Sequence, residues 1–109
     1  MVQRFFSDQM GNTISIPFPP KRIISLVPSQ TELLFDLGLD KEIVGITKFC
    51  VHPDDWITKK QIVGGTKNLW VDVIDRLHPD LIIGNKEENY REGISQLQSK
   101  YPVWMSDIV

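Results

Sequence analysis

The stretch KRIISLVPSQTELLFDLG (Lys21–Gly38) decides the fold of this chain, because it joins a strand directly to a helix. Its first part, Arg22–Val27, is a compact run with several β-branched residues, which is typical of a buried strand. Ser29 can cap the helix that follows, and Glu32 can return a hydrogen bond to the backbone N–H of that cap. Gly38 supplies the left-handed residue that often ends a helix. The stretch therefore predicts a strand, a short loop and a capped helix, the first half of a βαβ unit.

The rest of the chain repeats this alternation of strand and helix. Strands are predicted at Glu42–Ile46, Asp80–Gly84 and Pro102–Asp107, and helices at Leu69–Leu77 and Asn89–Lys100. Strands that alternate with helices of this length imply βαβ units and parallel pairing. The sequence thus predicts an α/β fold of Rossmann-like type, with a mainly parallel sheet and flanking helices.

The N-terminal residues follow a different pattern. Gln3–Asp8 and Asn12–Pro17 are short β-prone runs joined by the turn residues Gly11-Asn12, which is typical of a β-hairpin. We therefore divide the chain into an N-terminal β-hairpin at residues 1–20 and an α/β lobe at residues 21–109.

Composition excludes several classes of protein. The chain has 109 residues with 12 basic and 14 acidic side chains and a net charge of −2, which argues against nucleic-acid binding. A single cysteine rules out an internal disulfide. The longest apolar runs, such as Leu81–Ile83, are far too short to span a bilayer. Residues 1–12 contain no apolar segment ending in small residues, so we expect no signal peptide in this chain, and a cytoplasmic location stays open.

A parallel sheet predicts the position of a ligand before any residue is interpreted. In open parallel sheets, ligands bind at the loops that leave the carboxyl ends of the strands. Three predicted loops meet this condition: Pro28-Ser29, Thr47–Asp54 and Asn85–Asn89. We expect the ligand at these loops.

Cys50 and His52 lie two positions apart, so in an extended loop their side chains project to the same side, within reach of one metal ion. A structural zinc site needs four protein ligands and a catalytic one usually three. The two residues are therefore weak metal candidates, and a half-buried cysteine with a hydrogen-bonded histidine is the simpler interpretation. A nucleophilic Cys50 with His52 or His78 as base is the enzyme alternative, but residues at this spacing rarely reach the contact that thiol activation requires. We expect no catalytic residues and no intrinsic cofactor.

Two further loops carry polar residues. Lys86 and Glu87 follow a predicted strand, where they could form a polar rim that orients a ligand, or Glu87 could complement the dipole of the next helix. The pair Gly64-Gly65 allows a tight backbone approach. It is no phosphate-binding loop, because the spaced second glycine and the Gly-Lys-Ser/Thr ending are missing.

Several motifs occur together in order along the chain: KRIISLVPSQTELLFDLGL, VGITKFCVHP, IVGGTKN, DVIDRLHPDLIIG and NKEEN. From about Phe5 onward this series resembles the N-terminal lobe of the class III substrate-binding proteins of ABC importers, which include cobalamin, siderophore and haem receptors. The resemblance implies two α/β lobes joined by a long helix, a ligand held between them, and a periplasmic or extracytoplasmic location. The second lobe has no counterpart in this chain, which is then a fragment of a longer protein, acts alone, or pairs with a second copy as a homodimer.

The resemblance also assigns roles to residues. Phe49 corresponds to an aromatic residue that packs on the ligand, although it could be an ordinary core residue, and Thr66 or Lys67 corresponds to a rim position. Cobalamin receptors often carry a tryptophan near the Thr66 position, and this chain does not. Asp72 corresponds to a surface carboxylate that pairs with arginines of the membrane permease, or it only complements a helix dipole. The complete set of expected ligand-binding residues is Pro28, Ser29, Phe49, Cys50, His52, Thr66, Lys67, Lys86 and Glu87.

The function expected from these observations is that of a non-enzymatic binding lobe. We expect it to capture a metal chelate for delivery to an ABC importer permease, and a corrinoid is the preferred candidate. A receptor for a ferric siderophore or haem is the alternative within the same class. An intracellular α/β enzyme or regulatory domain that uses Cys50 is the alternative from another class.

Overall fold

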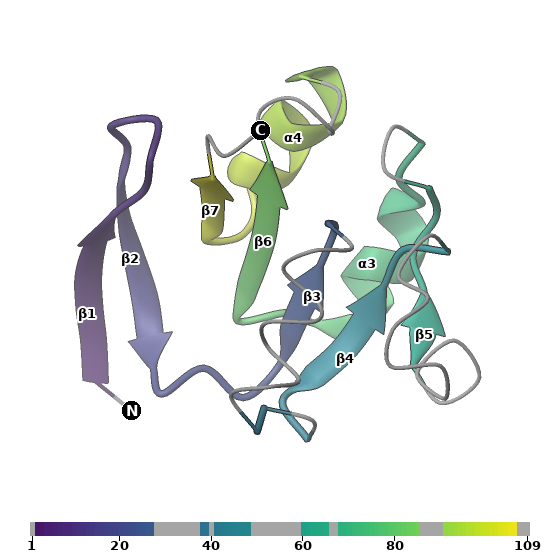
Figure 1. The fold of residues 1–109 in the computed structure, drawn as a ribbon, viewed down its shortest axis with the longest axis horizontal. Helices are drawn as coiled ribbons and strands as arrows, with labels where there is room; N and C mark the ends of the chain where they lie inside the picture. Colours follow the sequence, from purple (N-terminus) through teal and green to yellow (C-terminus); the bar gives the residue numbers. More distant parts are fainter. Residues whose placement is uncertain are drawn as a thin grey trace.

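The computed structural model describes residues 2–27, 38–39, 41–48, 60–65, 68–85 and 91–106. Within these residues the chain forms two sheets and two helices (Figure 1). The elements are β1 (Val2–Ser7), β2 (Thr13–Phe18), β3 (Ile23–Ser25), β4 (Ile43–Ile46), β5 (Gln61–Ile62), α3 (Val71–Leu77), β6 (Leu81–Asn85), α4 (Arg91–Gln98) and β7 (Val103–Ser106).

The larger sheet confirms the predicted fold class. Its five strands follow the order β5-β4-β3-β6-β7, and all four pairings between neighbours are parallel. The chain moves outward from β3 to β4 and β5, then crosses over through α3 to β6 on the other side of β3. Strand order therefore reverses between β3 and β6, as in other doubly wound α/β sheets. Strand β5 was not predicted, because two residues give no recognisable period.

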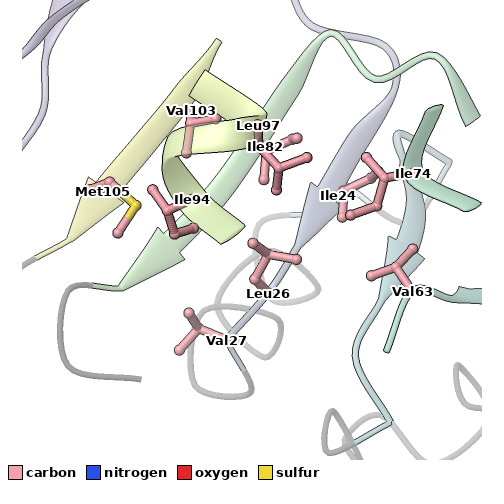
Figure 2. Close-up of a cluster of buried hydrophobic side chains, with 10 residues drawn as sticks. All are labelled: Ile24, Leu26, Val27, Val63, Ile74, Ile82, Ile94, Leu97, Val103 and Met105. Carbon is pink, nitrogen blue, oxygen red and sulfur yellow. The ribbon is translucent and has the colours of Figure 1, made fainter. Parts of the chain in front are cut away.

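Both faces of this sheet are apolar, as parallel sheets require. One face packs against Ile74 of α3 and against Ile94 and Leu97 of α4, and Figure 2 shows these side chains over the strands. The buried residues of this core are Ile24, Leu26, Val27, Val63, Ile74, Ile82, Ile94, Leu97, Val103 and Met105. The second cluster lies on the other face and contains Ile14, Ile16, Ile23, Ile43, Ile46 and Leu81.

The N-terminal hairpin is confirmed, with β1 and β2 antiparallel and Phe6 opposite Ile14. Its buried residues Ile14 and Ile16 alternate with more exposed ones, as expected of a strand with one packed face. The hairpin is tied to the large sheet by the buried carboxylate of Asp8. This group accepts hydrogen bonds from the backbone N–H groups of Met10 and Asn12 at 3.0 and 2.9 Å, and from that of Met105 in β7 at 3.3 Å.

Helix α3 begins later than predicted, at Val71 rather than Leu69, and helix α4 ends earlier, at Gln98 rather than Lys100. Helix α3 begins at Val71 after Trp70, whose side chain makes no capping hydrogen bond, and ends at His78, which has a left-handed backbone conformation with φ 49°. Gly38 also has a positive φ, 79°, but the helix predicted before it lies outside the described residues. Among the helices described, none is long and apolar enough to cross a membrane.

Candidate functional site

The candidate site is the carboxyl edge of the five-stranded sheet, where all strands end on the same side (Figure 1). Strand order reverses between β3 and β6, and the crevice at such a reversal is the usual ligand position in open α/β sheets. The described residues Val27, Lys48, Gly65 and Asn85 lead directly into the loops that were predicted to contact a ligand.

A layer of buried polar side chains follows this edge. Ser25, Thr47 and Ser106 are 0% exposed and Asn85 is 3% exposed, and they come at or just after the ends of β3, β4, β7 and β6, respectively. We refer to these four residues as the polar layer. Among the described residues, Asp8 is the one other buried polar or charged side chain. Buried polarity in the sheet is therefore concentrated at the edge where a ligand is expected.

Hydrogen bonds within the polar layer connect neighbouring strands. The Asn85 Nδ2 group donates to the Ser106 Oγ atom at 2.9 Å, and this hydroxyl donates to the backbone carbonyl of Gly84 at 3.2 Å. The Ser25 hydroxyl donates to the carbonyl of Val27 at 3.3 Å. All four residues of the layer also make at least one further interaction. Their polar groups are thus held by defined partners, as buried polar groups usually are.

The turn after β5 is built around Gly64. Its φ of 116° is a left-handed conformation, and an added Cβ atom would lie 2.2 Å from the carbonyl oxygen of Asn68. The backbone N–H of Lys48 donates to the carbonyl of Gly64 at 2.9 Å, so this turn is fixed beside the end of β4. The N–H of Gly65 donates to the carbonyl of Asn68 at 3.0 Å, which closes the turn. The predicted tight backbone approach at Gly64-Gly65 is confirmed.

The ligand-binding residues predicted from the sequence stay predictions. Pro28, Ser29, Phe49, Cys50, His52, Thr66, Lys67, Lys86 and Glu87 all lie outside the described residues. What the structure establishes is the position of their described neighbours at the carboxyl edge. Within the described part of the chain, no group of three His, Cys, Asp or Glu side chains could hold a metal ion.

Asp72 is exposed in the first turn of α3. Helix α3 begins on the side of the carboxyl edge, because Trp70 donates its backbone N–H to the carbonyl of Val63 just after β5. Asp72 therefore lies toward the rim of the candidate site, and among the described residues it has no ion-pair partner. His78, at the other end of α3, precedes the amino end of β6, on the side of the sheet opposite the candidate site.

Asp75, later in α3, has a different role. Its carboxylate accepts a hydrogen bond from the Tyr101 hydroxyl and another from the Lys100 Nζ group at 3.0 Å. The hydrogen bond from Tyr101, followed by that from Lys100, holds the pKa of Asp75 below its ordinary value. Burial, followed by the hydrogen bond to Asp75, raises the pKa of Tyr101 to about 12. These contacts connect α3 to the turn before β7, away from the carboxyl edge.

The polar layer was missed as a group in the sequence, although a signal was present. Thr47, Asn85 and Ser106 each end an otherwise apolar run, as in VGIT, LIIGN and VWMS, and Ser25 interrupts the apolar run IISLV. From the sequence, Thr47 and Asn85 were predicted only as the first residues of the loops Thr47–Asp54 and Asn85–Asn89. A polar residue at the same relative position of several strands can indicate the functional edge of a parallel sheet.

Comparison with known proteins identifies the class. A family model described as "Periplasmic binding protein" matches residues 23–107. The chain therefore belongs to this family of periplasmic binding proteins. A relative from Bacillus subtilis, the uncharacterized ABC transporter substrate-binding lipoprotein YvrC, is 34% identical over 79 residues, which are 72% of this chain and 24% of that protein. The chain thus spans about a quarter of the length of this relative.

Solved structures agree with this assignment. The periplasmic vitamin B12 binding protein BtuF of Vibrio cholerae is 29% identical with a TM-score of 0.75, over 84% of this chain and 36% of that one. The petrobactin-binding protein YclQ from Bacillus subtilis has a TM-score of 0.83 over 99% of this chain and 39% of that one. Its sequence identity is 24%, so this second likeness shows the fold alone.

Proposed function

We propose that this chain forms one wall of the ligand site in the substrate-binding protein of an ABC importer, and that the ligand is a metal chelate. The observation that carries the proposal is the carboxyl edge at the β3–β6 reversal, lined by a polar layer, in a chain of the periplasmic binding protein family. The role is one of binding without catalysis. Because the Bacillus subtilis relative is a lipoprotein and the Vibrio cholerae protein is periplasmic, an extracytoplasmic location follows from the same proposal.

A corrinoid is the first candidate ligand. The vitamin B12 binding protein of Vibrio cholerae shares both fold and 29% of aligned residues with this chain. In this proposal Phe49 offers a flat apolar surface to the macrocycle, and burial of aromatic area supplies much of the affinity. Cys50 and His52 act at most as auxiliary ligands of the metal. Thr66, Lys67, Lys86 and Glu87 form a polar rim that orients amides, carboxylates or hydroxyls of the ligand.

A ferric siderophore or haem is the second candidate, and one feature of the sequence favours it. Position 66 is threonine, whereas cobalamin receptors that the chain resembles often carry tryptophan there. A site without that ring has less aromatic surface for a corrinoid.

Titration of the complete protein tests the proposal. Cobalamin, cobinamide, a ferric siderophore and haem are each added, and binding is followed by calorimetry and by absorbance of the chelate. We expect one of them to bind with submicromolar affinity, on the order of −8 kcal/mol or better. Absence of binding by all four would contradict a metal-chelate receptor.

Two variants of the complete protein distinguish a packing site from a metal-ligating one. Phe49→Ala should weaken binding by about 2 kcal/mol or more, as truncation of an aromatic anchor usually does. Cys50→Ser should weaken binding by less than Phe49→Ala does. If Cys50→Ser or His52→Ala abolished binding while Phe49→Ala had little effect, direct ligation of the metal would replace aromatic packing as the explanation.

A further inference from the structure

The polar layer is costly for a sheet that is otherwise packed with aliphatic side chains. Burial of a hydroxyl or amide lowers stability unless every hydrogen bond is recovered, and an aliphatic residue of similar size carries no such requirement. Four of the five strands nevertheless end in, or lead directly into, a buried polar residue, and all four residues lie at the carboxyl edge. Local departures from the pattern of a stable core are expected at functional sites.

We propose that the Asn85–Ser106 pair is a positioning element that sets the ligand-facing ends of β6 and β7. This inference rests on the proposed function, because it assigns the pair to the same ligand edge. Neither residue is exposed enough to form a binding surface itself, at 3% and 0%. The pair acts through the chain that follows Asn85, where Lys86 and Glu87 are the predicted ligand contacts.

The geometry of the pair suits this role. Asn85 and Ser106 are partners in the β6–β7 register and are the last residues of their strands. The 2.9 Å hydrogen bond from Asn85 to Ser106 links the two side chains, and the 3.2 Å hydrogen bond from Ser106 to the Gly84 carbonyl returns to the backbone of β6. The two hydrogen bonds therefore hold β6 and β7 together at the end of their parallel ladder. β6 also borders the reversal of strand order, so this point adjoins the expected crevice.

Asp8 provides a matched control. It is also buried, at 6% exposed, and it also contacts the end of β7, through the Met105 backbone N–H. Its other hydrogen bonds are to Met10 and Asn12 in the hairpin turn, on the outer side of β7. Loss of its charge should therefore loosen the hairpin and weaken the contact at Met105, but it should leave the hydrogen bond between Asn85 and Ser106 in place.

The experiment uses Ser106→Ala, Ser106→Thr and Asp8→Asn in the complete protein. Ser106→Ala removes the shared oxygen, Ser106→Thr retains it, and amide hydrogen exchange, unfolding midpoint and cobinamide affinity are measured for each. For Ser106→Ala we expect exchange at residues 84–85 to accelerate and affinity to fall, each by about tenfold, the equivalent of one lost hydrogen bond. Ser106→Thr should stay within about twofold of wild type in affinity. Asp8→Asn should accelerate exchange around residues 8–12 and at Met105, and it should leave affinity unchanged.

The proposal is overturned if Ser106→Ala leaves exchange at residues 84–85 unchanged. It is equally overturned if cobinamide affinity falls as much in Asp8→Asn as in Ser106→Ala, since loss of stability alone would then account for both. Failure of the proposed function gives a separate result, in which the wild type binds neither cobinamide nor a ferric siderophore nor haem. In that case faster exchange at residues 84–85 in Ser106→Ala still supports the positioning role, and unchanged exchange refutes it.

Discussion

Gly64 is the single residue on which the turn beside the candidate site most depends. Its left-handed φ of 116° would strain any residue with a Cβ atom, and that atom would lie 2.2 Å from the backbone oxygen of Asn68. The obstacle is backbone rather than a movable side chain, so it cannot be relieved by a change of rotamer. The turn therefore requires glycine for two independent reasons.

Gly64→Ala should consequently lower the free energy of unfolding by roughly 3 kcal/mol or more. Gly11→Ala is the matched control, because Gly11 also has a left-handed φ, 82°, but has nothing within 4 Å of an added Cβ atom. Gly11→Ala should lower the free energy of unfolding by only about 1 kcal/mol, because it introduces backbone strain without a steric clash. Urea denaturation of both variants measures the difference. Equal losses would show that the contact with Asn68 is relieved by movement of the turn.

At the scale of elements, α3 is joined to the turn between α4 and β7 by Asp75, Tyr101 and Lys100. The ion pair with Lys100 is partly exposed, with 42% of the lysine and 36% of the aspartate side chain accessible, so water screens much of its attraction. The hydrogen bond from Tyr101 is the more buried of the two contacts. We therefore expect the tyrosine to contribute more than the lysine.

This connection predicts a pH dependence of stability. Because the folded-state pKa of Asp75 is lowered, mainly by Tyr101, its stabilising contribution is present above the unfolded pKa of about 4. The contribution is lost as pH falls through the lower folded value. The difference in urea midpoint between wild type and Asp75→Asn should thus be largest near pH 6 and shrink below about pH 3. A difference that is constant over this range would show that ionisation of Asp75 is irrelevant to the connection.

Tyr101 gives the corresponding prediction at high pH. Its folded pKa, raised to about 12, exceeds the unfolded value of about 10, so its contribution is complete below pH 10 and declines as pH rises through 12. Tyr101→Phe removes both the hydrogen bond and the titrating group. The wild type should therefore lose its advantage over Tyr101→Phe between pH 10 and 12, and Lys100→Ala should have the smaller effect at pH 7. Urea midpoints measured over this range test both statements.

At the scale of the whole molecule, the proposed function makes this chain one wall of a ligand site. It covers 24% of the Bacillus subtilis relative and 36% of the Vibrio cholerae structure. Small-molecule sites usually enclose most of the ligand surface, and one wall cannot do so. The 109-residue chain alone should therefore bind cobinamide or a ferric siderophore on the order of a hundredfold more weakly than the complete protein. Calorimetry on both proteins tests this, with circular dichroism to verify folding, and equal affinities would contradict a two-walled site.

Asp72 carries the prediction about the importer. If it docks to arginines of a permease at the rim of an interface, Asp72→Asn should slow association several-fold at low ionic strength and leave ligand affinity unchanged. Asp75 is unsuitable as a control, because its contacts with Tyr101 and Lys100 make its substitution destabilising. Glu42→Gln is the control, because it also removes one negative charge. Glu42 directly precedes the amino end of β4, on the side of the sheet opposite the carboxyl edge. Association with the reconstituted permease is measured at two salt concentrations, and identical behaviour of the two variants would remove the docking role.

Much of the fold was predictable from the sequence because its signals are local. The β-branched run before Pro28, the β-prone run Asn12–Pro17 and the apolar run at Leu81–Ile83 each predicted a strand that the structure contains. Their connection through helices implied parallel pairing, since a parallel strand needs a crossover of this length. The sequence by itself thus determined the α/β class and the N-terminal hairpin, and it predicted the carboxyl edge of the sheet as the place where a ligand would bind.

Only the tertiary structure decided which strands and side chains are neighbours. The two-residue strand β5 exists because Gly45 and Ile46 of β4 give it partners. The hydrogen bond between Asn85 and Ser106, which are 21 residues apart, depends on the β6–β7 register. The hydrogen bond between Asp75 and Tyr101 depends on the packing of α3 against the turn before β7. Contacts between residues far apart in the chain leave no period or motif in any short window, because their energy appears only when the whole sheet has assembled.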